Sequence, residues 1–160
     1  MTPATATSRS LGAELHQEAP FHGPEEEAFL SLQRTADQLR RELTDLLKHH
    51  HLTPQQYNVL RILRGAGAEG RLTGEIGDRL VVQDPDVPRL LDRMEKREWI
   101  TRQRQTDDRR CVRVTLTRAG KKLVDSLDAP VQALHVAQWA TLGKTKVRAL
   151  LESLASVRHR

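Results

Sequence analysis

The stretch from Asp84 to Thr117 constrains the fold more than any other part of the chain. Its first half carries apolar residues at the spacing of an amphipathic helix, and its second half alternates like two β-strands around a short turn. Nine basic and five acidic side chains lie between residues 89 and 113, and this excess of four makes up most of the formal charge of +5. Positive charge concentrated on a helix and a hairpin indicates a surface that binds a polyanion.

Length and composition narrow the classes of protein that fit the chain. A length of 160 residues predicts one domain with a sizeable core, and a pI of about 9.9 favours nucleic acid or an anionic membrane surface as partner. No apolar run is long enough to cross a bilayer and no signal-peptide core is present, so we expect a cytoplasmic protein without a membrane partner. Cys111 is the only cysteine, which excludes an intramolecular disulfide and a zinc-finger cluster.

The N-terminal part begins as an arm and continues as a long helix. Residues 1–24 are rich in Thr, Ala, Ser and Pro, which predicts a poorly ordered arm with a helical turn near Leu11. From Glu25 to His50, apolar residues recur in alternating steps of three and four, which is typical of helix–helix packing. These residues are Phe29, Leu32, Ala36, Leu39, Leu43 and Leu46. Such a stripe suits the core of one chain or a dimer interface, and both alternatives stay open.

Three consecutive histidines, His49, His50 and His51, end this helix candidate. Consecutive residues of a helix point about 100° apart, so three in a row do not converge on one metal ion. One histidine pairing with a distant ligand is the alternative, but a metal site needs a converging set of ligands. We therefore predict a solvated helix end and no metal.

Strong capping signals begin the next helix. Thr53 is a good N-cap, Pro54 suits the first helical position, and Gln56 completes a capping box. The helix is predicted to reach Arg64, just before a glycine-rich break at residues 65–70.

A short helix, a turn and a basic helix follow in order. Residues 72–80 are predicted to form the short helix with Thr73 as its cap, and Asp84 or Asp86 is predicted to begin the basic helix. This order of elements is typical of a helix-turn-helix.

The basic helix has two distinct faces. Its buried stripe has i, i+3, i+4, i+7 spacing and consists of Val87, Leu90, Leu91 and Met94. The opposite face presents Asp86, Arg89, Arg93, Lys96 and Arg97. Arginines on that face can contact guanine edges in a major groove or bind phosphates. The alternative is a solvated charged face on which Asp92 pairs with Lys96.

The hairpin after this helix favours the DNA-binding interpretation. Trp99–Gln105 and Cys111–Thr117 alternate like two strands, and the turn between them places Arg109 and Arg110 at its tip. An arginine at a projecting tip can enter a minor groove, where the negative potential is enhanced. A neighbouring carboxylate can fix the guanidinium by a charge-assisted hydrogen bond.

Two apolar helices are predicted after the hairpin. The first runs from Thr117 to about Trp139, with a kink at Pro130, which lies inside it. The second begins near Leu142, and five of its residues are predicted to face inward: Val147, Leu150, Leu151, Leu154 and Val157. Neither helix is predicted to bind DNA. Both are therefore predicted to form part of a surface that faces a partner chain.

This ordered series resembles the MarR family of winged helix-turn-helix transcriptional regulators over roughly residues 28–157. The segments that carry the resemblance are Leu52-Thr53-Pro54-Gln55-Gln56-Tyr57, Leu72-Thr73-Gly74-Glu75-Ile76-Gly77, Arg89 to Arg97, Asp108-Arg109-Arg110, and Val112 to Thr117 with Gly120. The resemblance implies a mainly α (α+β) fold in which residues 25–160 form one domain. Within it, residues 53–117 would form the winged helix-turn-helix lobe, and residues 25–50 and 118–158 the flanking N- and C-terminal dimerisation helices.

The resemblance also implies a function. A homodimer would bind a pseudo-palindromic operator in double-stranded DNA and repress transcription until a small aromatic or phenolic effector released it. The recognition helix would span residues 84–97 with Arg89 near the bases, and the wing would enter the minor groove with Asp108 orienting Arg109 or Arg110.

Two other classes of function have less support from the sequence. A non-specific or architectural DNA-binding protein, or a protein-interaction module of the same fold, is the alternative to a sequence-specific regulator. The sequence contains no nucleophile–base pair or metal-ligand set of recognisable spacing, so we expect neither an enzyme nor a bound cofactor.

Three positions depart from the family pattern. Pro88 stands where threonine is common, so an amide donor and a hydroxyl are missing from the recognition helix. Glu98 stands where glycine is usual, so either a left-handed conformation there costs on the order of 1 kcal/mol or the chain turns differently. Gly143 is a weaker cap for the last helix than relatives usually have.

Cys111 and the two tryptophans have simple interpretations. Some relatives sense oxidants through a cysteine near the first helix, whereas Cys111 lies in the predicted wing strand, so we expect a passive strand residue. Trp99 and Trp139 are expected to pack in the core rather than to line a ligand pocket.

Overall fold

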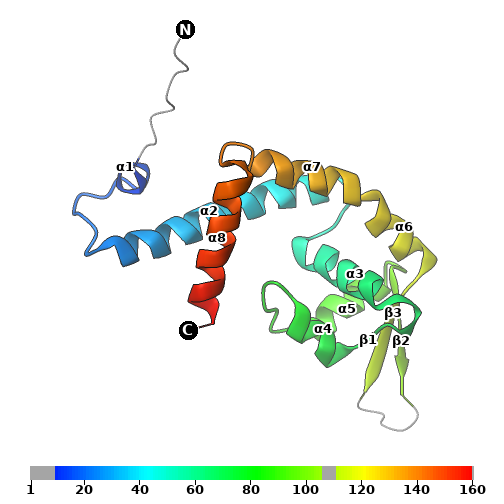
Figure 1. Ribbon diagram of the computed structural model, residues 1–160. Coiled ribbons are helices and arrows are strands. Elements are labelled where there is room, and N and C mark those ends of the chain that lie inside the picture. Colours follow the sequence, from blue (N-terminus) through cyan, green and yellow to red (C-terminus); the bar gives the residue numbers. More distant parts are fainter. Residues whose placement is uncertain (1–9, 106–110, 160) are drawn as a thin grey trace. The chain divides into compact units, whose positions relative to one another are not determined.

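The computed structural model describes residues 10–105 and 111–159 (Figure 1). Its contacts divide the chain into two compact units, one up to Glu42 and one from Leu43 onward. The boundary falls inside the long helix α2 (Pro24–Lys48), so the last six residues of this helix belong to the second unit.

The first unit contains α1 (Leu11–Glu14) and most of α2. The hydroxyl of Ser10 caps α1 by accepting the backbone N–H of Ala13 at 3.4 Å, so the expected helical turn is present in the arm. Phe29 and Leu32 of the α2 stripe are exposed.

The histidine run ends α2, as predicted. His51 adopts a left-handed conformation with φ of 55°, and its N–H donates to the carbonyl of Lys48 at 3.0 Å. The next N–H, of Leu52, donates to Leu47 at 3.1 Å, and both leucine side chains are buried. This is the Schellman motif that commonly closes helices. Among the described residues, no group of His, Cys, Asp and Glu side chains is placed to hold a metal ion.

The second unit begins with a helical and sheet-containing lobe. Its elements are α3 (Pro54–Ala66), the 3-10 turn η1 (Gly67–Glu69), β1 (Arg71–Leu72), α4 (Thr73–Arg79), α5 (Val87–Glu95), β2 (Ile100–Arg104) and β3 (Val112–Leu116). The predicted capping box begins α3: Thr53 accepts the N–H of Gln56 at 3.2 Å, and Gln56 accepts the N–H of Thr53 at 3.0 Å. Fully buried side chains from every helix and long strand of the lobe form one core, including Leu60, Ile76, Leu91, Ile100 and Val114.

The sheet has three antiparallel strands in the order β1-β3-β2, one more than the predicted hairpin. Leu72, which the sequence placed in a helix, pairs with Arg113 of β3, and Arg102 of β2 lies opposite Val114. A two-residue strand is too short to show the alternation by which strands are recognised. Gly70 precedes it with φ of 64°, and a Cβ there would meet the carbonyl oxygen of Val114, so only glycine fits.

The predicted cap of α4 is wrong. Thr73 is the first residue of the helix, and its hydroxyl donates to the carbonyl of Val112 at 3.3 Å. The start of the helix is held instead by Glu75, whose carboxylate accepts the N–H of Leu72 at 2.9 Å. This hydrogen bond lowers the pKa of Glu75 below its usual value.

The predicted helix after the hairpin is two helices, α6 (Arg118–Ser126) and α7 (Asp128–Gln138). Pro130 has no N–H to donate to Ser126, and its ring crowds that carbonyl, so the regular helix ends where the proline removes its hydrogen bond. The chain therefore breaks at Leu127 rather than kinking at the proline. Thr117 caps α6 by accepting the N–H of Gly120 at 3.0 Å.

The last helix, α8 (Gly143–Arg158), differs from its prediction. None of its 16 described residues is buried, and Leu151 and Val157 are each 59% exposed, so the prediction that all five apolar residues face inward is wrong within a single chain. No described side chain caps its start at Gly143, as the sequence suggested.

Within the described part of the chain, no helix is both long and apolar enough to span a membrane.

Candidate nucleic-acid interface

The start of α5 is fixed by two aspartates in the preceding turn. Asp86 is the N-cap, and its carboxylate accepts the N–H of Arg89 at 3.1 Å. Asp84 accepts the N–H of Asp86 at 2.9 Å, which shapes the turn before the helix. Of the two predicted start positions, Asp86 is therefore the one that caps the helix.

The inner face of α5 sets which side chains point outward. Leu90, Leu91 and Met94 are buried, and Val87 is half-buried against the same core. The opposite face carries three exposed basic residues: Arg89, Arg93 and Lys96. No side chain in the described ranges forms an ion pair or hydrogen bond with these three cationic groups, so their charge is available to a ligand.

Arg102 of β2 fixes the angle between α5 and the sheet. Its guanidinium lies 2.6 Å from Asp92 and 2.8 Å from Glu95, and Nε donates to Glu95 at 2.9 Å. Its backbone N–H donates to Glu95 as well, at 3.1 Å. Desolvation lowers the pKa of Arg102, but the hydrogen bonds to Glu95 and Asp92 outweigh it and the net shift is upward. Asp92 therefore pairs across to the strand, not with Lys96.

At the end of α5, Glu98 adopts the left-handed conformation, which is one of the two alternatives left open by the sequence. Its φ is 57°, its N–H donates to Glu95 at 2.8 Å, and the N–H of Trp99 donates to Met94 at 3.2 Å. The hydroxyl of Thr117 donates to the carbonyl of Glu98 at 2.6 Å, which ties this turn to the end of β3. The left-handed backbone conformation of Glu98 thus directs the chain from the end of α5 into β2.

Arg97 is separate from the other predicted contact residues. Its guanidinium carbon lies 5.1 Å from the centre of the Trp99 ring, and Nη1 donates to the carbonyl of His51 at 3.4 Å. Trp99 is half-buried against the core, as expected. The structure therefore groups Arg89, Arg93 and Lys96 on one face and holds Arg97 against the α2–α3 connection.

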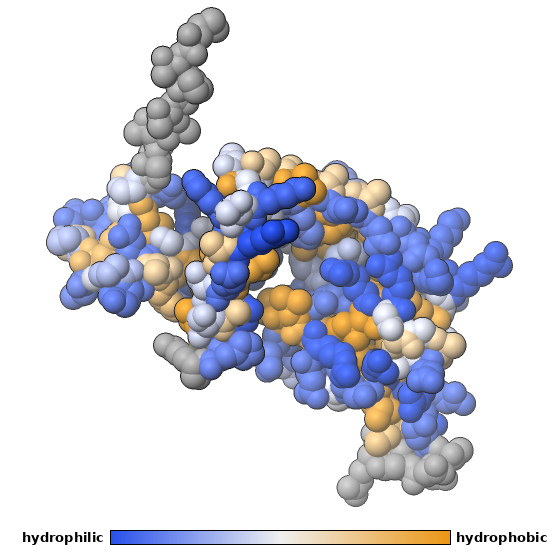
Figure 2. Space-filling model, in the orientation of Figure 1, coloured by the Kyte–Doolittle hydropathy of each residue, from blue (hydrophilic) through white to orange (hydrophobic). Residues whose placement is uncertain are grey.

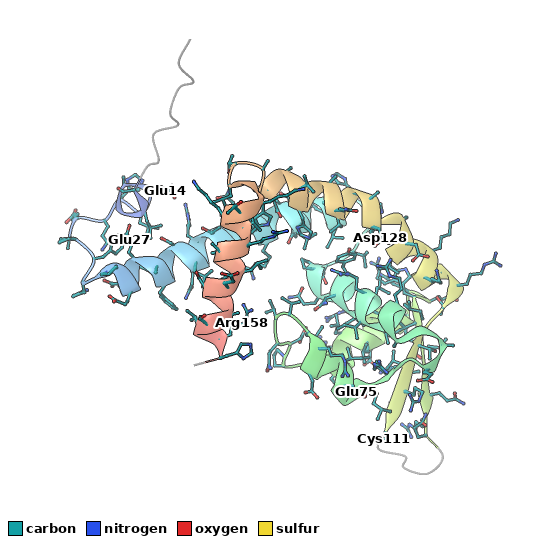
Figure 3. The ribbon with its side chains drawn as sticks, viewed as in Figure 1. Glu14, Glu27, Glu75, Cys111, Asp128 and Arg158 are labelled. Atoms are coloured by element: carbon teal, nitrogen blue, oxygen red, sulfur yellow. The ribbon has the colours of Figure 1, made fainter. Side chains whose placement is uncertain are left out.

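The hairpin is described as far as Gln105 and from Cys111 onward, where the N–H of Gln105 donates to the carbonyl of Cys111 at 2.9 Å. Cys111 is half-buried at this end of the strands (Figure 3). The predicted tip residues, Asp108, Arg109 and Arg110, lie outside the described residues.

A cleft of about 830 Å³ lies between α3 and the helices α7 and α8. Tyr57 and Trp139 contribute aromatic rings to it, and Arg61, Lys144 and Arg148 contribute cationic groups. Trp139 was expected in the core, but it lines this cleft and is half-buried. The cleft combines flat apolar surface with positive charge, which is suited to an anionic aromatic compound.

Comparison with known proteins agrees with this architecture. Residues 52–112 match the MarR family. The chain is 36% identical to a MarR transcription factor from Planctomyces limnophilus, whose crystal structure aligns with 88% of this chain and 98% of that one at a TM-score of 0.67. The chain belongs to the MarR family. Members of this family are transcriptional regulators and not enzymes, in agreement with the expectation from the sequence.

Two further MarR-family proteins are informative. A point mutant of E. coli MarR, solved in complex with operator DNA, is 27% identical and aligns with 79% of this chain and 89% of that one at a TM-score of 0.72. The regulator TtmR of Methylorubrum extorquens is 36% identical over 118 residues, or 74% of this chain. The match spans only 58% of TtmR, so the chain covers less than two thirds of that relative's length.

An ion-pair cluster joins the MarR-type lobe to the helices that follow it. Arg64 of α3 binds both oxygens of Asp128, at 2.7 and 2.9 Å, and Asp125 at 3.2 Å, while Lys121 binds Asp125 at 2.6 Å. The two aspartates flank the α6–α7 break, where Figure 3 labels Asp128. The pKa of Asp128 is lowered chiefly by Arg64, and that of Asp125 chiefly by Lys121.

Proposed function

We propose that this MarR-family protein is a sequence-specific DNA-binding repressor that acts as a homodimer on a pseudo-palindromic operator and is released by a small aromatic or phenolic ligand. The observation that carries the proposal is the basic face of α5, whose Arg89, Arg93 and Lys96 are exposed beside a hairpin. The relative solved in complex with operator DNA supports DNA binding by this fold.

The proposed contacts divide by position. Arg89, in the first turn of α5, would contact a guanine edge, because recognition helices enter the major groove with their N-terminal residues at the bases. Arg93 and Lys96 lie further along the helix and would bind phosphates. Asp86 would lie beside Arg89 at the bases, whereas Arg97 would act indirectly through its contact with His51. Asp108, Arg109 and Arg110 remain the proposed minor-groove contacts of the wing.

A homodimer is supported by apolar side chains that each terminal helix leaves exposed. Leu151 and Val157 of α8 are exposed, and so are Phe29 and Leu32 of α2. Large apolar side chains that a helix leaves exposed in this way are typical of an interface between subunits. A two-fold dimer would present two copies of α5 to half-sites roughly one helical turn of DNA apart.

The cleft supports the proposed control by a ligand. An aromatic ring would lie against Tyr57 and Trp139, and a phenolate or carboxylate would pair with Arg61 or Arg148. The cleft lies between the DNA-binding lobe and helices α7 and α8. A ligand bound there would therefore change the distance between the DNA-binding lobes of the two subunits. A dimer on a promoter would block transcription, and the ligand would lift the block.

A titration against salt tests the proposal. Duplexes from the promoter of the protein's own gene should bind at least about a thousand times more tightly than random duplexes at physiological salt. The logarithm of affinity should fall steeply with the logarithm of salt concentration, because phosphate contacts release counterions. A flat dependence on salt would show that the basic face does not bind DNA.

A pair of arginine variants tests the assignment of α5. Arg89→Ala should reduce the preference for promoter over random DNA, whereas Arg118→Ala, which removes the same charge from the exposed start of α6, should leave that preference unchanged. If wild-type affinity for both duplexes is similar, the alternative of a non-specific or architectural binder holds instead.

A further inference from the structure

The end of α5 that would enter the groove carries exposed apolar side chains beside Asp86 and Arg89, and the rest of its outer face is basic. In the turn before α5, Val81 is 85% exposed and Val82 is 54% exposed, and Pro85 is exposed as well. Pro88, in the first turn of the helix, is also exposed and lies directly beside Arg89. Figure 2 shows an apolar area over this turn, with further apolar areas elsewhere in the same view.

The same helix end has few donors to offer a phosphate. Pro88 has no N–H, the N–H of Arg89 is bound to the carboxylate of Asp86, and the N–H of Leu90 is bound to the carbonyl of Asp86. The carboxylate of Asp86 also repels a phosphate. Helix N-termini usually bind phosphates through free N–H groups. This one is suited to base edges instead, where it presents the ring of Pro88 beside the side chain of Arg89.

We infer that Pro88 is a specificity-determining residue that reads the C5-methyl group of a thymine next to the guanine contacted by Arg89. The inference rests on the proposed DNA-binding function. In the major groove only thymine presents a methyl group, and an apolar side chain at the groove floor contacts that methyl. Proline suits the role because it has neither a hydroxyl nor an amide that could bond to the other bases.

The spacing of the two side chains fits adjacent base pairs. Pro88 and Arg89 are consecutive, so they rise about 1.5 Å along the helix and point about 100° apart. That separation is compatible with the roughly 3.4 Å step between base pairs along one strand. One turn further on, Asp92 is held by Arg102 at 2.6 Å, so the edge of α5 that carries Pro88 is fixed relative to the sheet.

Replacing thymine by uracil tests the inference without changing the protein. An operator is first selected from random duplexes by the wild-type protein, and each thymine of the half-sites is then replaced by uracil, which lacks only the methyl group. One position beside the guanine read by Arg89 should lose about fourfold in affinity per half-site, the amount expected for one buried methyl group. Thymines outside the half-sites serve as the internal control.

Two variants assign the effect to Pro88. In Pro88→Ser, which restores the N–H and a hydroxyl, thymine and uracil duplexes should bind equally at that position. Pro85→Ala removes a nearby exposed proline before the N-cap and should retain the fourfold difference. Circular dichroism checks that the variants fold, and Pro88→Ala, which keeps a smaller apolar group and should show a reduced difference, replaces Pro88→Ser if that protein does not fold.

The possible outcomes distinguish a failure of the inference about Pro88 from a failure of the proposed DNA-binding function. If every uracil duplex binds like the thymine duplex while the operator still exceeds random DNA, the methyl reading is wrong and the proposed function stands. If Pro88→Ser, or Pro88→Ala in its place, keeps the full difference between thymine and uracil, another residue reads the methyl group and the inference is also wrong. If no duplex is preferred over random DNA, the proposed function itself fails.

Discussion

Helices α5 and α8 are both amphipathic, but only α5 has its apolar side covered within the chain. Leu90, Leu91 and Met94 of α5 are buried, whereas none of the described residues of α8 is, and two of its apolar side chains are largely in water. Apolar surface that a chain leaves exposed in this way commonly marks an interface. The apolar side of α5 is thus covered by the core of its own lobe, whereas Leu151 and Val157 of α8 stay exposed in a single chain.

The largest expected effect is on the stability of the lobe. Leu91→Ala removes a fully buried side chain and should lower the free energy of unfolding by about 2–5 kcal/mol. Leu151→Ala removes the same atoms from an exposed position of α8 and should change it by less than about 1 kcal/mol in dilute, monomeric protein. Urea denaturation measures both. Equal losses would mean that α8 is already covered in one chain, and the comparison would fail.

A second effect should appear only on assembly. Replacing Leu151 and Val157 together by Glu places charges on the exposed apolar face of α8 and should weaken dimerisation about 100-fold, or ~2.7 kcal/mol, because buried unpaired charge is costly. Ser156→Glu adds charge to the side of α8 that faces away from this apolar stripe and should leave the dimer intact. Sedimentation over a concentration series measures both variants. A wild-type protein that stays monomeric at high concentration would contradict the interface.

A smaller effect concerns the ion pairs that join α5 to Arg102 of β2. Arg102→Ala removes the bonds to Asp92 and Glu95 and should cost about 1 kcal/mol of stability, since both partners are partly exposed to water. DNA affinity should fall about tenfold, because α5 loses its fixed angle to the sheet.

Two control variants separate the role of Arg102 in positioning α5 from the effect of its positive charge. Arg102→Lys keeps the charge but loses the planar contact with both carboxylates, so it should recover little of the affinity. Arg104→Ala removes one exposed charge from the same strand and should weaken binding by a few-fold at most. If Arg104→Ala and Arg102→Ala weaken DNA binding equally, Arg102 contributes only its charge.

The elements that could be predicted from the sequence are those set by neighbouring residues. The capping box at Thr53 and the two faces of α5 each depend on a few positions along the chain. These local patterns are sufficient to predict the basic face of the candidate site.

The predictions from sequence are wrong where a residue that is distant along the chain determines a contact. Thr73 bonds the carbonyl of Val112 across the sheet rather than capping α4, and Asp92 takes Arg102 from a neighbouring strand in place of nearby Lys96. A periodic stripe also shows that one face of α8 is apolar without showing which chain covers it, so Leu151 was misplaced. The pairing of Asp92, Glu95 and Arg102 could have been suspected from opposite charges facing each other across the predicted helix-to-strand turn.

The smallest expected effect lies at the turn that leaves α5. Glu98→Gly should raise the free energy of unfolding by up to about 1 kcal/mol, because glycine adopts a φ of 57° without the penalty of a side chain, although its greater freedom in the unfolded chain offsets part of the gain. Glu98→Ala removes the carboxylate but keeps a Cβ, so it should show no such gain. His51→Gly, at the matching position of α2 with φ of 55°, should behave like Glu98→Gly. Thermal and urea denaturation of the three variants would show whether the gain follows the backbone conformation, and a gain for Glu98→Ala equal to that for Glu98→Gly would instead attribute it to relief of charge repulsion.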